Sequence, residues 1–128
     1  MKHTGIINAE LMYELTLLGH KDLFLIVDAG FPIPKGVARI DLAVTLGHPD
    51  FESVFSAILK EIVVETLIVA KETKEVSPGV YDLFSSTAPL EFISHEALKA
   101  LAKQSVFIVR TGEATPYANV AIRCGVAF

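Results

Sequence analysis

Residues 19–34 read GHKDLFLIVDAGFPIP, and this stretch decides the fold. Its middle, Leu23 to Val27, is continuously apolar, which indicates a strand covered on both faces by helices. Asp28 ends the apolar run, and the glycine and two prolines that follow predict an irregular but ordered loop. In open α/β sheets, ligands bind beyond the carboxyl ends of the strands, so Asp28 is the first candidate for a ligand contact. The alternative is that Asp28 only hydrogen-bonds its own loop.

The length of 128 residues predicts a single domain that spans residues 1–128. Counted with glycine and without tyrosine, about 55% of the residues are apolar, against roughly 45–50% in typical domains. No uninterrupted apolar run approaches the roughly 18 residues of a membrane span. We therefore expect apolar surface to be buried between subunits of a homo-oligomer, with no membrane as a partner.

The charge and the cysteine content restrict which binding partners and which cellular compartment we expect. The chain has 15 acidic and 11 basic residues without a basic cluster, which argues against nucleic acid and favours a small neutral or cationic ligand. The first residues, MKHTG, lack the apolar segment of a signal peptide, and the lone Cys124 cannot form an intrachain disulfide. Both observations predict a cytoplasmic protein.

Strand and helix patterns alternate along the chain. We expect helices after the caps Asn8, Asp50 and Ser94 and a short helix at 77–84. Gly19 is expected to end the first helix in the left-handed conformation. The expected strands are 5–7 at an edge, 23–27, 62–70, 90–93, 105–110 and 119–124. Residues 37–46 fit either a short strand or a helix, and 71–75 form a solvated charge run. This alternation predicts an α/β fold, a three-layer α/β/α domain with a mostly parallel or mixed central sheet.

Metal and nucleophile chemistry have little support in the sequence. The four histidines have no metal-ligand spacing; a site from His20, Asp28 and His95 is conceivable, but nothing in the spacing indicates a closed ligand set, so we expect no metal. Cys124 lies in an apolar strand, where a thiol is usually an inert core residue. No glycine-rich phosphate loop is present. Acid–base catalysis is therefore the class of chemistry that remains for this sequence.

Two histidines suit acid–base roles. His20 follows the negative end of a helix, which favours its protonated form, whereas His95 lies in the first turn of a helix, which favours the neutral form. Lys99, four residues after His95, projects from the same helix face. The alternative is that one or both are ordinary surface histidines. Glu65 interrupts an apolar strand, and pairing with an arginine or a subunit contact is the simpler explanation for it than catalysis.

His20 and Asp28 stand at opposite ends of one predicted strand. At about 3.3 Å per residue their side chains would lie on the order of 20–25 Å apart in one subunit. Either the strand is bent, or each site takes residues from two neighbouring chains. The second possibility agrees with the apolar excess.

Several segments together resemble the D-ribose pyranase family, which includes the fucose mutarotases. They are GH with the following strand and DAGFPIP, RIDLAVTLGHPDF, the glutamate of VVETLIVA, SHEALK, and RTGEATPYANVAIRCGVAF. The resemblance extends from Gly5 to Phe128. The PIP loop, Arg39 to Asp41 and Thr115 to Asn119 are more similar to the ribose branch than to the fucose branch.

The resemblance implies interconversion of β-D-ribopyranose and β-D-ribofuranose, which delivers the furanose to ribokinase. It also implies no cofactor, a homodecamer of two pentamers, and pockets between subunits. His20 would be the proton donor. The sugar hydroxyls would be held by Asp28, His95, Lys99, Tyr117 and Asn119, with the backbone at Ala118 lining the pocket.

Two other functions remain open at this point. One is a mutarotase or pyranase for another monosaccharide, such as fucose. The other is a non-catalytic sugar-binding accessory of ribose uptake, because every implied site residue could serve binding alone.

Overall fold

Six strands form one mixed sheet in the computed structural model, which describes residues 1–128. The strands are β1 (Leu23–Val27), β2 (Ala38–Asp41), β3 (Val64–Ala70), β4 (Leu90–Ile93), β5 (Phe107–Arg110) and β6 (Val120–Cys124). Their order across the sheet is β2-β5-β1-β6-β3-β4. β6 runs antiparallel to both of its neighbours, whereas the other pairs are parallel. The expectation of a mixed sheet is therefore confirmed.

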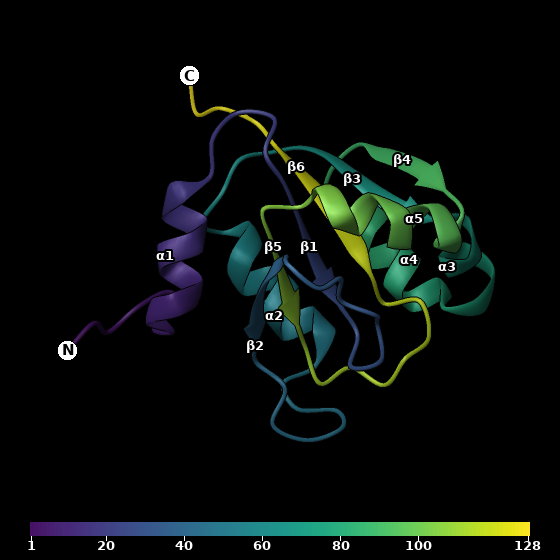
Figure 1. Ribbon diagram of the computed structural model, residues 1–128, viewed down its shortest axis with the longest axis horizontal. Helices are drawn as coiled ribbons and strands as arrows, with labels where there is room; N and C mark the ends of the chain where they lie inside the picture. Colours follow the sequence, from purple (N-terminus) through teal and green to yellow (C-terminus); the bar gives the residue numbers. More distant parts are fainter.

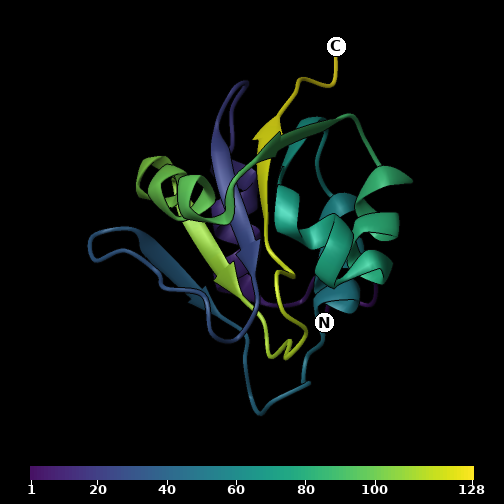
Figure 2. The same ribbon diagram turned by 90° about the vertical axis from the view of Figure 1, so that its right-hand side faces the viewer.

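Helices cover both faces of the sheet. They are α1 (Ala9–Leu17), α2 (Phe51–Leu59), α3 (Lys71–Val76), α4 (Pro78–Ser85) and α5 (His95–Leu101), and α5 continues into the 3-10 turn η1 (Ala102–Gln104). One core cluster packs α1, α2 and α4 against one face, and a smaller cluster packs α5 and η1 against the other. Figure 2 shows α5 on one side of the sheet and α3 with α4 on the other. The three-layer prediction is confirmed.

β1 lies in the middle of the sheet because its side chains can be buried on both faces. Phe24 and Ile26 belong to the larger core cluster, whereas Leu25 and Val27 belong to the smaller one. All four are fully buried. The continuous apolar run of this strand is thus explained by its two covered faces.

Three predicted helix starts agree with the structure. Asn8, Asp50 and Ser94 each accept a hydrogen bond from the backbone N–H three residues on. Each side chain satisfies a donor that the helix itself leaves unpaired, which is why these short polar residues begin the three helices.

Two local predictions are corrected, those for residues 5–7 and for Gly19, and other segments become defined. Residues 5–7 form no strand, and the ambiguous segment 37–46 contains β2. Gly19 does not take the left-handed conformation; its N–H is bound by Asp22, and Lys21 has a φ of +73° instead. The charge run at 71–75 forms most of α3 and its charged side chains are exposed or half-buried, as expected for a solvated run; only Thr73 is buried. The short helix expected at 77–84 is present as α4; Ser77 is at its N-cap position, but the Ser77 hydroxyl donates to the carbonyl of Pro116 rather than making a cap hydrogen bond.

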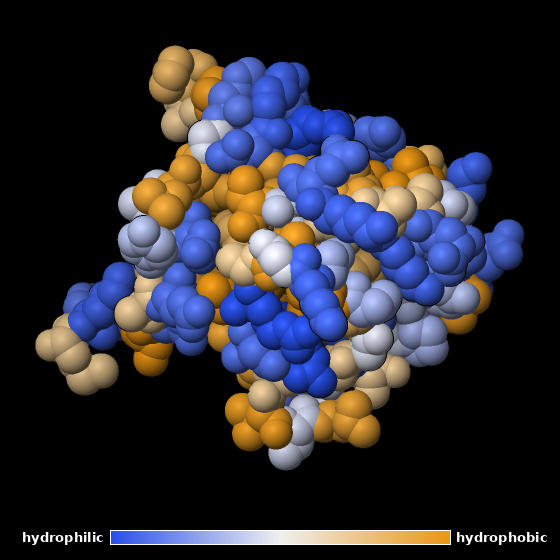
Figure 3. Space-filling model, viewed as in Figure 1, coloured by the Kyte–Doolittle hydropathy of each residue, from blue (hydrophilic) through white to orange (hydrophobic).

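Several large apolar side chains stay exposed on the single chain. They are Met1, Ile7, Tyr13, Leu17, Val44, Leu46, Val63, Val76, Phe92, Val106, Val126 and Phe128. Val44 and Leu46 lie in the loop between β2 and α2, which forms an apolar patch at the bottom of the view in Figure 3. No helix of the structure has both the length and the apolar character needed to cross a bilayer.

Candidate active site

A cavity of about 480 Å³ opens where the loops after β1 and before β6 meet the start of α5. Its lining residues are Asp28, Gly30, Phe31, Pro32, His95, Glu96, Lys99, Pro116 and Tyr117. Four of the predicted site residues are therefore brought together by one chain. They come from segments that are far apart in the sequence: the loop after β1, the helix α5 and the loop before β6 (Figure 1).

Asn119 holds the carboxylate of Asp28. Ile26 pairs with Val120 across β1 and β6, so the residue before β6 lies beside the end of β1. Asn119 Oδ1 accepts from the Asp28 N–H and Asn119 Nδ2 donates to Asp28 Oδ2, both at 2.9 Å. Asp28 Oδ1 accepts from Gly30 N–H. Asp28 thus does both things that the sequence suggested: it hydrogen-bonds its own loop and it borders the cavity.

Helix α5 provides the basic side of the cavity, with His95 in its first turn and Lys99 in its last turn. Lys99 Nζ lies 3.0 Å from Glu96 Oε1, and this hydrogen bond lowers the pKa of Glu96 below its ordinary value. The Nδ1 atom of His95 is buried and has no hydrogen-bond partner within the chain. A buried imidazole nitrogen without a partner is rare in folded proteins and is a ready contact for a ligand hydroxyl.

Tyr117 forms the wall opposite α5. Its ring meets the ring of His95 edge to face, with centroids 4.9 Å apart. Its φ of +60° lies in the left-handed region. Thr73 donates to its carbonyl at 3.0 Å, and Ser77 donates to the carbonyl of Pro116 at 2.6 Å.

Ala118 and Asn119 lie behind this wall rather than on it. Both are fully buried, and the side chain of Ala118 belongs to the larger core cluster. Direct contact of Asn119 or of the Ala118 backbone with a sugar stays a prediction, whereas the contact of Asn119 with Asp28 is part of the structure.

His20 does not lie at this cavity. It is exposed and sits in the loop between α1 and β1, at the upper end of the sheet in Figure 1. Lys21 Nζ lies 2.9 Å from Glu65 Oε1, and this hydrogen bond lowers the pKa of Glu65, with a smaller contribution from nearby His20. Glu65 therefore pairs with a lysine, not with an arginine. Its second oxygen, Oε2, is buried without a partner.

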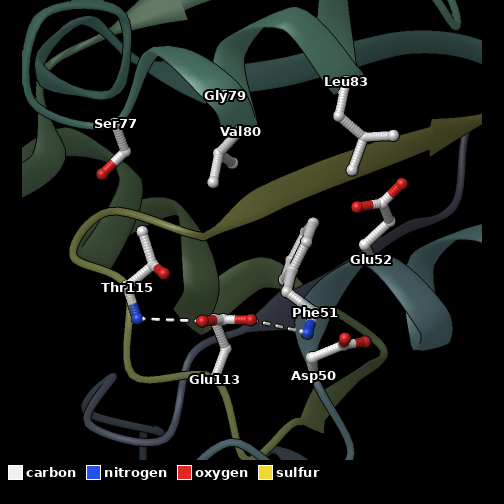
Figure 4. Close-up of a pocket in the computed structure, with 9 residues that line it drawn as sticks. All are labelled: Asp50, Phe51, Glu52, Ser77, Gly79, Val80, Leu83, Glu113 and Thr115. Carbon is white, nitrogen blue, oxygen red and sulfur yellow. Dashed lines mark hydrogen bonds between the residues drawn. The ribbon is translucent and has the colours of Figure 1, made fainter.

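A second cavity, of about 270 Å³, lies where the starts of α2 and α4 meet the segment that carries Glu113 and Thr115 (Figure 4). Glu113 projects into it between the starts of α2 and α4. Its carboxylate accepts the backbone N–H groups of Phe51, Ala114 and Thr115. Burial raises the pKa of Glu113, but these hydrogen bonds outweigh it and hold the pKa below its ordinary value. Glu113 thus ties the loop to α2.

Other anchoring residues of the site loops were not predicted from the sequence. Arg110 donates to the carbonyl of Ala29 and pairs with Asp41, both at 3.0 Å, which joins β2 and β5 to the loop after Asp28. Glu72 accepts from the backbone N–H of His95 at 3.0 Å. These contacts join residues that are far apart in the chain, so no local sequence pattern predicts them. No group of three or more His, Cys, Asp or Glu side chains is placed to hold a metal ion.

Fold and cavity together define an α/β protein with a polar pocket at the carboxyl ends of two parallel strands. The chain belongs to the RbsD / FucU transport protein family, whose model matches residues 1–127. It is 47% identical to D-ribose pyranases of Geobacillus thermodenitrificans and Coprothermobacter proteolyticus, covering the whole chain and at least 99% of each relative.

Two solved structures place the fold within this family. The structure of Bacillus subtilis RbsD complexed with D-ribose is 41% identical and superimposes with a TM-score of 0.93, with all of both chains covered. A fucose mutarotase from Streptococcus pneumoniae in complex with L-fucose is 19% identical, with a TM-score of 0.73 over all of both chains. The second likeness concerns the fold alone.

Proposed function

We propose that residues 1–128, as one domain, form a D-ribose pyranase that interconverts β-D-ribopyranose and β-D-ribofuranose without a cofactor. The observation that carries the proposal is the cavity at Asp28, His95, Lys99 and Tyr117, in a chain 47% identical over its whole length to D-ribose pyranases. The lining combines a carboxylate, an ammonium, an imidazole and a phenol, which together offer donors and acceptors for a polyol.

Ring opening of a hemiacetal requires two proton transfers. The ring oxygen receives a proton while the anomeric hydroxyl loses one, and a different hydroxyl then closes on the open-chain aldehyde. A positioned acid or base typically contributes 10²–10⁴-fold to such a step. Asp28 can accept from a hydroxyl, because its carboxylate is held in place by Asn119 and Gly30. Lys99 can donate to another hydroxyl, and a bound sugar would compete with Glu96 for it.

The acid in this proposal is His20 of a neighbouring copy of the chain. Within one chain, His20 and Asp28 are separated by the whole length of β1, which rises about 3.3 Å per residue. We propose a homo-oligomer, a decamer of two pentamers, in which each site lies between subunits. The exposed apolar side chains and the unpaired buried oxygen of Glu65 near His20 support a subunit contact.

The cellular role follows from the reaction. The furanose would be delivered to ribokinase, and because that kinase uses ATP, the protein would work in the cytoplasm. A polar pocket of this kind should reject sugars that lack a hydroxyl it binds, since a buried partner would be left unpaired.

Proton exchange spectroscopy tests the proposal. Saturating one anomeric signal of equilibrated D-ribose should transfer saturation between β-pyranose and β-furanose when the protein is added. His20→Ala should remove most of this exchange, about 10²-fold or more, whereas His3→Ala, at another exposed histidine, should not. Ribose binding without transfer would establish the accessory role instead, and faster exchange of fucose than of ribose would establish a mutarotase.

A further inference from the structure

Two buried hydroxyls outside the cavity hold the loop that carries Tyr117. Thr73, in α3, is fully buried and Ser77, just after α3, is 6% exposed. Neither lines the candidate active site. Thr73 Oγ1 donates to the carbonyl of Tyr117 at 3.0 Å, and Ser77 Oγ donates to the carbonyl of Pro116 at 2.6 Å. These bonds span 44 and 39 residues of sequence.

The two carbonyls belong to the peptide groups on either side of the Tyr117 Cα atom. Because peptide groups are planar, φ and ψ of Tyr117 are the only soft rotations between them. Fixing both peptide groups therefore fixes the backbone of Tyr117. Its φ of +60° is one that residues with a Cβ atom seldom adopt, and such a conformation persists where the surroundings hold it.

The Tyr117 backbone determines where its ring lies. The ring contacts His95 edge to face at 4.9 Å, and both side chains line the cavity. Helix α3 also anchors the second wall of the cavity, because Glu72 of this helix accepts the backbone N–H of His95 at 3.0 Å. Both walls of the cavity are thus anchored to α3 and the residue after it.

We propose that Thr73 and Ser77 are positioning residues that hold Tyr117 in its left-handed conformation and thereby set the affinity of the cavity for a sugar. The part about sugar rests on the function proposed above, whereas the part about the backbone does not. Neither hydroxyl touches the cavity, so their loss acts on the position of the Tyr117 ring and leaves the proton-transferring groups in place.

Thr73→Val and Thr73→Ser form a matched pair. Valine keeps the shape and loses the donor, whereas serine keeps the donor. We expect Thr73→Val to raise KM for ribose exchange about tenfold, the effect of one lost buried hydrogen bond, with kcat changed less than about threefold. Thr73→Ser should restore KM. In a Tyr117→Ala background, Thr73→Val should leave KM unchanged, because the ring it positions is absent.

A readout independent of ribose separates this inference from the proposed function. The chain has three tyrosines and no tryptophan, so the ring signals of Tyr117 can be assigned by NMR. These signals should shift in Thr73→Val and in Ser77→Ala, and stay near wild type in Thr73→Ser. The two shifting variants are independent, so the test holds even if one of them does not fold. An unmoved Tyr117 signal, or a full KM effect in the Tyr117→Ala background, overturns the proposal. If wild type exchanges no ribose but the signals shift as expected, only the proposed function fails.

Discussion

Mixing two inactive variants tests whether each site is shared between chains. His20→Ala removes the proposed acid and should cost about 10²–10⁴ in exchange rate. Asp28→Asn keeps the shape of the side chain and removes the charge that strengthens its hydrogen bonds to a sugar. In one chain these residues lie at opposite ends of β1, too far apart to touch one substrate. If they act together, they do so across a subunit contact.

The expected recovery follows from the geometry. In a random 1:1 hetero-oligomer, a shared site is intact when His20 comes from the Asp28→Asn chain and Asp28 comes from the His20→Ala chain. This happens at about one site in four. Co-expressed variants should therefore reach about 25% of wild-type exchange, at least tenfold above either parent. If each site were confined to one chain, every site would carry one of the two substitutions. The exchange rate would then stay at the parental level.

The assay uses saturation transfer between the β-pyranose and β-furanose anomeric signals of ribose. Two different affinity tags allow the mixed oligomer to be purified and its composition to be checked by mass spectrometry. The separately purified variants, mixed without subunit exchange, are the control and should stay inactive. Exchange at the parental level in a verified mixed oligomer would refute the shared site, and so would a fully active monomer.

Three further predictions concern single residues. Asn119→Ala should weaken ribose binding in calorimetry and reduce the free energy of unfolding by about 1 kcal/mol, because it leaves the partly buried Asp28 N–H without its partner; unchanged values in both would remove this role. The pKa of Glu113 is lowered from 4.5 in the folded state, so its stabilising effect is present above pH 4.5 and lost as the pH falls through the folded pKa. Acid unfolding followed by circular dichroism should thus be less steep in Glu113→Gln, and identical curves would contradict this. Burial raises the pKa of the Cys124 thiol to about 11, so iodoacetamide should leave it unmodified in the native protein at pH 7–8 and label it after unfolding; rapid native labelling would contradict its burial.

Much of the fold could be predicted because its signals are local. The apolar run of β1, the caps Asn8, Asp50 and Ser94, and the strand–helix alternation each depend on a few neighbouring residues. Asp28 could be identified as a site candidate for the same reason, since it directly follows a buried strand. The prediction for Gly19 failed because a neighbouring side chain decides the turn: Asp22 accepts from the Gly19 N–H, and Lys21 takes the left-handed conformation instead.

The sequence by itself determined most of the elements, the family, and the residue types available for acid–base chemistry. Only the tertiary structure decided which of those residues meet. It brings Asp28 to Asn119 across 91 residues and Thr73 to Tyr117 across 44, and it leaves His20 at the other end of the sheet. The physical reason is that strand order and helix packing are set by burying apolar faces across the whole chain, and a hydrogen bond between distant segments has no counterpart in any local pattern.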